Sequence, residues 1–349
     1  MADIYDTPRA EVATNLQASV GAYLAEQILA AIDSGAGTQN PDIAIVSDFV
    51  PGDAIPENTD IVVVKPGEGG AINVPGGVGA IIFTGPAGVS VQLNAESSVG
   101  VQLSSGSDVV TVTTDGSIDP SAALSFNLGD GNDVLFGAQD SRNNVIGGAG
   151  DDTMTGGNKN DSFDIGQGND KVDAGSGFDQ AFIRGSINDY NTTVNADGSI
   201  SLTNKLTNEV TTMKNLEFLT FEQGGVLLNV TTETGFASAS LYEVVLGRSA
   251  DSSGFEFYSG TDGTKLIEAA NGMLGSDEFT SKFGPVDQMT DSQFLDVMYQ
   301  TAFNRDADGG GLQFWLDKMA AGMSRGEIAV RFAYSAEAQA TFDTEIIKT

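Results

Sequence analysis

A fixed nine-residue period constrains the fold of this sequence more than any other feature. Four aspartates lie nine residues apart, at Asp152, Asp161, Asp170 and Asp179. A glycine-rich tetrad ends two residues before each aspartate. An apolar residue lies two residues after each one, and these are Met154, Phe163, Val172 and Ala181. Each unit therefore predicts a tight turn, a carboxylate and a strand of about three residues whose apolar side chain points inward.

Two such units make one full coil, so strands two units apart are expected to stack in parallel. This arrangement places Asp152 over Asp170 on one edge of the roll and Asp161 over Asp179 on the other. Each edge becomes a column of carboxylate and carbonyl oxygens, without sulfur or imidazole. Hard oxygen ligands on flexible loops select Ca²⁺. Ordinary Gly/Asp turns of a β protein are disfavoured as an explanation, because four consecutive units keep their register.

The stretch from Leu128 to Phe182, which begins Gly129-Asp130-Gly131-Asn132-Asp133, resembles the repeats-in-toxin (RTX) family of calcium-binding proteins. The resemblance implies a calcium-loaded parallel β-roll. The residues expected to form its metal sites are Gly129, Gly131, Asp133, Gly148, Gly150, Asp152, Gly157, Asp161, Gly166, Gly168, Asp170, Gly175, Gly177 and Asp179.

One unit departs from the pattern. The step from Asp133 to Asp152 is two units plus one residue, and between them Asn143 stands where an aspartate belongs and Ser141 where the second glycine belongs. We expect a bulge there, with a weak or absent ion site. Further upstream, the half-match around Asp108 is interpreted as a relic of the repeat.

The composition excludes several classes of function. The chain has 48 acidic and 16 basic residues, a net charge of −32, and neither cysteine nor histidine. Disulfides, Cys/His zinc sites, His-based triads and HExxH proteases are therefore excluded. Nucleic acid and anionic membrane surfaces are poor partners for such a chain. We expect no enzyme, although chemistry that uses only carboxylates stays formally open.

Localisation depends on the resemblance. The N-terminus has no apolar signal region, and no apolar run approaches the roughly 18 residues of a membrane span. RTX proteins usually leave diderm bacteria by type I secretion, with an uncleaved C-terminal signal. The resemblance therefore implies contact with that secretion machinery during export. It also implies calcium-dependent folding outside the cell or at its surface, where Ca²⁺ is plentiful.

We expect a multidomain, mainly β protein with a C-terminal all-α domain. Its expected parts are an N-terminal helical arm (1–38), a β-rich domain (39–127), the calcium β-roll (128–183), a β cap (184–232) and a helical domain (233–349). Apolar spacing predicts a helix over residues 9–33, which either caps the domain or docks on a neighbouring molecule. The β-rich domain fits a solenoid or a sandwich, and a solenoid that continues into the roll is preferred.

The helical part contains a second internal repeat. Tyr242, Arg248, Asp251 and Gly254 return, in the same order and with the same spacing, as Tyr299, Arg305, Asp308 and Gly311. The two copies resemble a small helical domain of unknown function that often accompanies RTX repeats. We expect the aspartates to cap helices and the arginines to favour the preceding helix ends. A metal in the EF-hand-like loop from Asp306 to Asp317 is the alternative. Phe314 and Trp315 are expected in the core.

The leading hypothesis is a secreted calcium-binding structural protein that self-assembles into a surface layer, filament or biofilm matrix. A second hypothesis is a lectin-like adhesin that holds a glycan, such as cell-surface polysaccharide, on residues 40–127. Against it, the segment has few aromatic residues that could stack on a sugar, Phe49 and Phe83 among them. A carboxylate-based enzyme acting on polysaccharide is the third and least favoured hypothesis.

Overall fold

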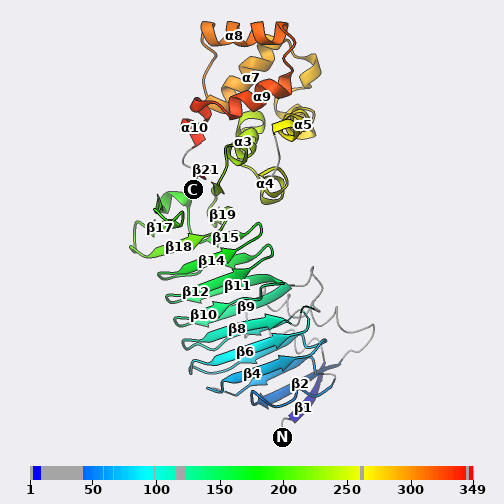
Figure 1. The fold of residues 1–349 in the computed structure, drawn as a ribbon, viewed down its shortest axis with the longest axis vertical. Coiled ribbons are helices and arrows are strands. Elements are labelled where there is room, and N and C mark those ends of the chain that lie inside the picture. Colours follow the sequence, from blue (N-terminus) through cyan, green and yellow to red (C-terminus); the bar gives the residue numbers. More distant parts are fainter. Residues whose placement is uncertain are drawn as a thin grey trace. The chain divides into compact units, whose positions relative to one another are not determined.

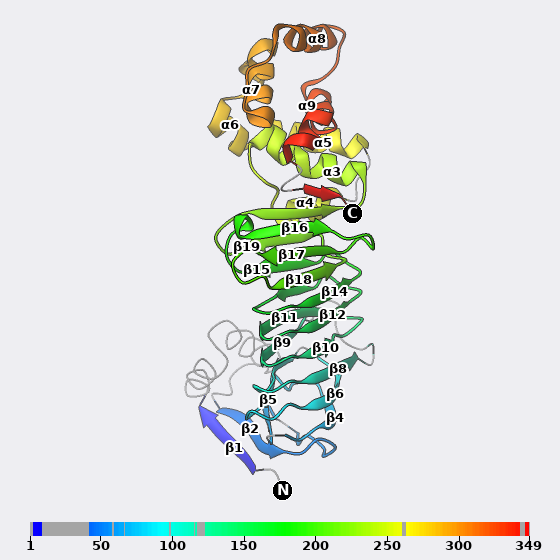
Figure 2. The same cartoon turned by 90° about the vertical axis from the view of Figure 1, so that its left-hand side faces the viewer.

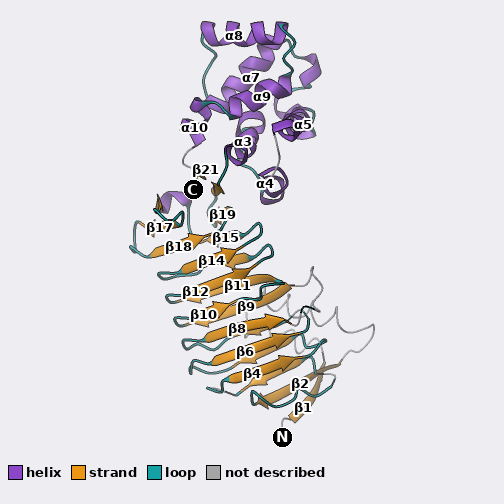
Figure 3. Ribbon diagram, in the orientation of Figure 1, coloured by secondary structure: helices purple, strands orange, loops and turns teal. Residues whose placement is uncertain are grey.

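The computed structural model describes residues 3–8, 42–57, 59–65, 67–97, 99–114, 116, 123–259, 263–342 and 346–348. The helix expected over residues 9–33 lies outside these ranges. The chain forms two compact units, residues 1–224 and 225–349. Strands make up most of the first unit and helices most of the second (Figure 3), as the sequence predicts.

The first unit is a parallel β-solenoid whose successive strands alternate between two sheets (Figures 1 and 2). In hydrogen-bonding order, the first sheet of this unit consists of β1 (Asp3–Pro8), β2 (Asp42–Phe49), β3 (Ile61–Val64), β5 (Ala80–Phe83), β7 (Gly100–Gln102), β9 (Ala123–Asp130), β11 (Arg142–Ala149), β13 (Ser162–Asp164), β15 (Gln180–Ile183) and β19 (Phe218–Phe221).

The second sheet lies opposite the first. In order, it consists of β4 (Gly70–Val74), β6 (Ser90–Ala95), β8 (Val109–Thr114), β10 (Val134–Phe136), β12 (Thr153–Gly157), β14 (Lys171–Gly175), β18 (Val210–Lys214), β17 (Ile200–Asn204) and β16 (Tyr190–Val194). Each coil thus contributes one strand to each sheet. This continuous stack confirms the solenoid that the sequence favoured over a sandwich.

The strand register confirms that two nine-residue units form one coil. Met154 pairs with Val172 in the second sheet, and Phe163 pairs with Ala181 in the first. In both pairs the separation along the chain is twice the nine-residue period. Upstream coils are longer and less regular, as the pairing of Val101 with Phe126 shows. The solenoid therefore contains the RTX-like coils as its most regular part.

The interior of the solenoid is a narrow apolar layer between the sheets. The side chains of Met154, Phe163, Val172 and Ala181 are at most 3% exposed, as predicted from their position after each aspartate. The interior continues upstream through Val110 and other aliphatic residues. Burying a Met, Phe or Val side chain stabilises a fold by about 1.5–3 kcal/mol, and each regular coil buries at least one of these.

Both ends of the solenoid carry antiparallel strands. Strands β16, β17 and β18 form a meander in which β18 pairs in parallel with β14, and a turn over 195–199 joins β16 to β17. A short 3₁₀ helix, η1 (Ile187–Asp189), precedes β16. At the other end, β1 pairs antiparallel with β2. Strand β1 was not predicted, since it lies within the arm expected to be helical.

The second unit begins with β20 (Val226–Val230), which pairs in parallel with β21 (Ile346–Lys348). Its helical segments are α3 (Glu233–Leu241), the π-helical turn η2 (Tyr242–Leu246), α4 (Ser252–Ser259), α5 (Gly263–Leu274), α6 (Asp277–Phe283), the 3₁₀ turn η3 (Val286–Gln288), α7 (Asp291–Phe303), α8 (Gly309–Ala320), α9 (Arg325–Ala333) and α10 (Ala336–Phe342).

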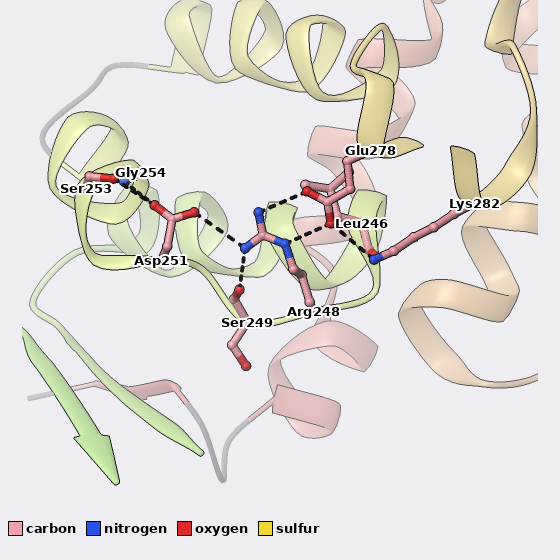
Figure 4. A network of polar contacts seen from close by, with 8 residues as sticks. All are labelled: Leu246, Arg248, Ser249, Asp251, Ser253, Gly254, Glu278 and Lys282. Atoms are coloured by element: carbon pink, nitrogen blue, oxygen red, sulfur yellow. Dashed lines mark hydrogen bonds and ion pairs between the residues drawn. The ribbon is translucent and has the colours of Figure 1, made fainter. Parts of the chain in front are cut away.

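The repeat in the sequence corresponds to a repeated set of contacts. Figure 4 shows Arg248 between Asp251 and Glu278, with Nε and Nη2 each donating to one oxygen of the Glu278 carboxylate, at 2.8 and 3.1 Å. Arg305 binds Glu337 in the same way, at 2.8 and 2.9 Å. This role of the arginines was not predicted, although the sequence shows both glutamates in matching Ser-x-Glu segments.

Both copies also place an aspartate at the start of a helix. The side chain of Asp251 accepts a hydrogen bond from the amide of Gly254, and that of Asp308 accepts one from the amide of Gly311. These bonds confirm the capping prediction. The expectation that Phe314 is a core residue is wrong, because its side chain is 52% exposed on α8. Trp315 is only half-buried, although its ring centroid lies 5.2 Å from that of Phe332.

Candidate metal sites

The aspartates of the repeat form hydrogen-bonded ladders along the two edges of the solenoid. On one edge, the amide of Asp133 donates to Oδ1 of Asp152 at 2.9 Å, and the amide of Asp152 donates to Oδ1 of Asp170 at 3.0 Å. On the other edge, the amide of Asp161 donates to Oδ1 of Asp179 at 2.7 Å. The predicted stacking of Asp152 over Asp170 and of Asp161 over Asp179 is therefore present.

The ladders extend beyond the residues that the sequence identified. The amide of Asp108 donates to Oδ1 of Asp133 at 2.7 Å, so the supposed relic is an integral rung of the ladder. At the other end, the amide of Asp179 donates to Oε2 of Glu217 at 2.8 Å. Glu217 takes the place of the next aspartate, but a stretch of chain much longer than one coil separates it from Asp179. Its position therefore carries no periodic signal in the sequence.

Four of these carboxylates keep one oxygen buried without a hydrogen-bond donor. The side chains of Asp133, Asp152, Asp170 and Asp179 are at most 1% exposed. In each of them Oδ1 accepts the ladder bond, whereas Oδ2 has no hydrogen-bond partner in the described structure. A buried charged oxygen without a partner is costly. A cation bound beside these four atoms would offset that cost.

Burial changes the acidity of these groups. In the ion-free fold, loss of solvation raises the pKa of Asp133 and Asp152 to about 7, that of Asp170 to about 6 and that of Asp179 to about 8. Neighbouring carboxylates on the same edge add to the increase, because like charges oppose ionisation. The amide donors of the ladder act in the opposite direction. Negative charge at these positions is therefore unfavourable unless positive charge is supplied.

The loop glycines allow adjacent coils to approach closely. A Cβ atom on Gly148 would lie 1.9 Å from the carbonyl oxygen of Gly129, and one on Gly150 would lie 1.7 Å from that of Gly131. Both glycines also have positive φ, at 103° and 131°, a region that other residues avoid. Glycine is therefore needed at these turns, as the sequence predicts, both because a Cβ atom would clash with the next coil and because φ is positive.

These residues fit a hard cation of the calcium type. The available ligands are carboxylate oxygens and backbone carbonyls, which suit Ca²⁺. Among the described residues, no three acidic side chains converge on one point. Ligation of an ion would therefore combine the Oδ2 atoms of Asp133, Asp152, Asp170 or Asp179 with loop carbonyls. Bound Ca²⁺ would supply the positive charge that these buried oxygens lack.

Asp161 and Asn143 are arranged differently from the four aspartates whose Oδ2 atom has no donor. Oδ1 of Asp161 accepts bonds from the amide of Asn143 and from its side-chain nitrogen, at 2.7 and 3.0 Å. Oδ2 of Asp161 accepts a bond from the amide of Gly157 at 2.6 Å. Both oxygens of Asp161 are thus occupied by donors of the protein. The structure brings Asp161 into the predicted ladder but gives it different partners.

Residues 146–181 match the family model of the RTX calcium-binding nonapeptide repeat, in four copies. The chain carries RTX calcium-binding repeats. RTX repeats bind Ca²⁺ and are typical of secreted proteins, and proteins built on them are typically structural or toxin-like rather than enzymatic. Residues 270–342 match a domain of unknown function, DUF4214, which covers the second helical copy and the end of the first. No curated protein and no solved structure matches the chain.

The EF-hand-like segment of the DUF4214 domain has its acidic groups engaged in other contacts. Oδ1 of Asp306 accepts a bond from Gln300, Asp308 caps α8, and Oδ1 of Asp317 accepts a bond from Gln313. These contacts favour the capping role over metal binding. In the part of the chain that the structure describes, no helix is long and apolar enough to cross a membrane.

Proposed function

We propose that this RTX-repeat protein is a secreted structural protein that folds on Ca²⁺ outside the cell and then self-assembles into a surface layer, filament or biofilm matrix. The observation that carries the proposal is the set of four buried carboxylate oxygens without a donor, at Asp133, Asp152, Asp170 and Asp179. Such a set is costly without cations and favourable with them.

Calcium binding and folding are coupled in this proposal because the ligands come together only in the coiled state. Asp152 and Asp170 belong to different coils, and they are adjacent only when β12 pairs with β14. A ligand that binds only the folded chain stabilises it by about 2.7 kcal/mol per site when its free concentration is 100 times Kd. Several sites would thus add up to a large part of a typical folding free energy.

The proposal that the chain self-assembles is supported by the exposed end of the second sheet. Strand β4 is the outermost strand of that sheet, with no further neighbour among the described residues. An uncovered edge strand can pair with another chain. The net charge of −32 opposes association of like molecules, and Ca²⁺ would lower this repulsion. The same ion would therefore favour both folding and assembly.

The test is a calcium titration of the chelated protein, followed by circular dichroism, light scattering and electron microscopy. We expect the β signal to grow cooperatively with Ca²⁺ and to be reversed by chelator, and ordered sheets or fibres to appear afterwards. Mg²⁺ at the same concentration is the control, because it demands a smaller octahedral site and should not substitute. A β signal that does not change on chelation contradicts calcium-coupled folding, and persistent monomers at millimolar Ca²⁺ contradict assembly.

The adhesin alternative gains little support from the segment in which we expected its glycan site. In that segment, the rings of Phe49 and Phe83 are at most 2% exposed and cannot stack on a sugar. In its favour stands a half-open pocket of about 520 Å³ in the cap region, lined in part by Arg184, Tyr190 and Lys205. A glycan array tests this alternative. Strong, specific binding by the calcium-loaded chain would support an adhesin.

A further inference from the structure

The loops that precede the ladder aspartates fall into two classes according to the backbone of two residues. These are the residues four and two positions before the aspartate, here called the second and fourth residues of the loop. In the open class, both residues are glycines with φ between 93° and 143°. The pairs are Gly129 and Gly131, Gly148 and Gly150, Gly166 and Gly168, and Gly175 and Gly177. The aspartate that follows each pair is one of the four whose Oδ2 atom has no donor.

In the closed class, the amide of the second residue itself donates to the aspartate. Gly157 donates to Oδ2 of Asp161 at 2.6 Å, and Ser104 donates to Oδ2 of Asp108 at 3.0 Å. The hydroxyl of Ser104 also donates to the Asp108 carboxylate. Neither Gly157 nor Ser104 has positive φ. In these loops the protein supplies the donor that an open loop lacks.

The fourth residue of the loop separates the two classes within the RTX repeats. The Asp161 unit has a glycine at its second position, Gly157, but Lys159 at its fourth. A side chain at that position disfavours the left-handed backbone that the open loops adopt. Without that left-handed backbone, the loop turns the N–H group of Gly157 toward Asp161. This unit is therefore one residue short of the open pattern.

Asn143 indicates what takes the place of a cation on this edge. Its side-chain nitrogen donates to the carbonyls of Ala138 and Ser141 and to Oδ1 of Asp161, at 3.0, 3.2 and 3.0 Å. Two loop carbonyls and one carboxylate are the kind of oxygen atoms that would surround a metal ion. Here an amide group holds them together. On this edge, hydrogen bonds from Asn143 thus join its loop to Asp161.

We propose that, within the RTX repeats of this solenoid, the residue at the fourth loop position decides whether a unit binds an ion. It follows that Lys159 makes the Asp161 unit a self-closed loop that binds no Ca²⁺, although this unit lies within the matched repeats. The inference rests on the proposed function, since it presumes that the other units bind Ca²⁺. It adds that the repeats are not equivalent, and that one coil junction is closed without calcium.

The first experiment compares two conservative substitutions in the full chain. Calcium per chain is counted by equilibrium dialysis for the parent, Asp152→Asn and Asp161→Asn. We expect Asp152→Asn to bind at least one ion fewer than the parent. Asp161→Asn should bind the same number of ions as the parent, although its amide nitrogen replaces one of the two oxygens that accept from Gly157 and Asn143. An Asp161→Asn chain that folds and loses an ion would overturn the inference.

The second experiment opens the closed loop. Lys159→Gly completes the two-glycine pattern and should bind one more ion per chain than the parent. Lys159→Ala removes the charge without allowing positive φ, and Asn158→Gly adds flexibility at the wrong position, so both should match the parent. Equal stoichiometry for all four chains overturns the role of the fourth residue, as does a gain in Lys159→Ala.

Anomalous scattering from crystals of the parent grown with Ca²⁺ gives an answer that does not depend on whether any variant folds. We expect density beside Asp152 and Asp170 and none in the loop of residues 156–161. An ion in that loop contradicts the inference while leaving calcium-coupled folding intact. If the parent binds no calcium at all, the proposed function itself fails, so the two failures are distinguishable.

Discussion

At the scale of single residues, what distinguishes the repeat positions is the donor that each carboxylate receives. Asp152 and Asp161 occupy the same place in the nine-residue pattern, and both are at most 1% exposed. However, Oδ2 of Asp152 lacks a donor, whereas Oδ2 of Asp161 accepts the amide of Gly157. Identical residues in one repeat can therefore have different ligand-binding capacities, because the backbone beside them differs.

Asn143 provides a test of how much a single amide contributes to the ion-free fold. Replacing it with aspartate removes a donor to three oxygens and places a second carboxylate beside Asp161. We expect Asn143→Asp to lower the free energy of unfolding in chelator by about 1–3 kcal/mol, and more if the new carboxylate is charged. Urea denaturation of the chelated protein measures this change.

The control for that substitution is Asn144→Asp, which adds the same charge at the next position. The side chain of Asn144 faces away from the core and is only partly buried on β11. It should change the free energy of unfolding by no more than about 0.5 kcal/mol. Equal losses in the two variants would mean that net charge, rather than the bonds of the Asn143 amide, explains the effect.

At the scale of elements, the period in the sequence predicted the coil length, the inward residues and the stacked aspartates. It did so because side chains alternate across a strand, so that a nine-residue repeat fixes which face each residue occupies. The same reasoning could not recognise the rungs formed by Asp108 and Glu217. Neither the step from Asp108 to Asp133 nor the step from Asp179 to Glu217 is a multiple of the nine-residue period. Their place in the ladders follows only from strand pairing.

Other features depended on contacts between distant residues and were therefore hidden. The bidentate pairs from Arg248 to Glu278 and from Arg305 to Glu337 join residues 30 and 32 positions apart. The exposure of Phe314 could not be read from its apolar character, because that depends on what covers α8. Lys159, by contrast, was visible in the sequence as a departure from the glycine pattern. That this lysine closes the loop around Asp161 could be recognised only from the backbone angles.

Strand β4 makes the assembly proposal testable at the level of one element. Ala71 and Asn73 are exposed on this outermost strand, and lysine on an edge strand discourages pairing with another chain. We expect the double variant Ala71→Lys, Asn73→Lys to keep its calcium-dependent β signal but to stay monomeric in light scattering. Thr111→Lys with Thr113→Lys, two exposed positions on the inner strand β8, is the matched control and should still assemble. Assembly of the β4 variant would rule out this edge as the contact.

At the scale of the whole molecule, buried carboxylates couple stability to pH when calcium is removed. The pKa of Asp152 is about 7 and that of Asp179 about 8 in the ion-free fold, against about 3.9 in an unfolded chain. The folded chain therefore binds more protons than the unfolded chain between roughly pH 4 and 8. Its stability is greatest at the acid end of this window and is lost as the pH rises through the folded pKa values.

We accordingly expect the chelated protein to show more β structure by circular dichroism at pH 5 than at pH 8. With saturating Ca²⁺ this preference for acid should disappear, because the ligands are then ionised and paired with the metal. Acid also reduces the general repulsion of the −32 charge. The comparison is therefore repeated in 1 M NaCl, which screens exposed charges far more than buried ones. If the pH effect vanishes in salt, the buried aspartates are not its source.

The ladders of amide-to-carboxylate bonds also have a mechanical consequence. Each rung connects one coil to its neighbour, and the first and last coils lie at opposite ends of the stack (Figure 1). A pulling force applied along the stack would therefore load the coils in series, so that they peel away one at a time. The extension should rise in steps of about one coil of chain, and bound calcium should raise the force at which each step occurs. A protein built in this way can yield under tension and re-form link by link.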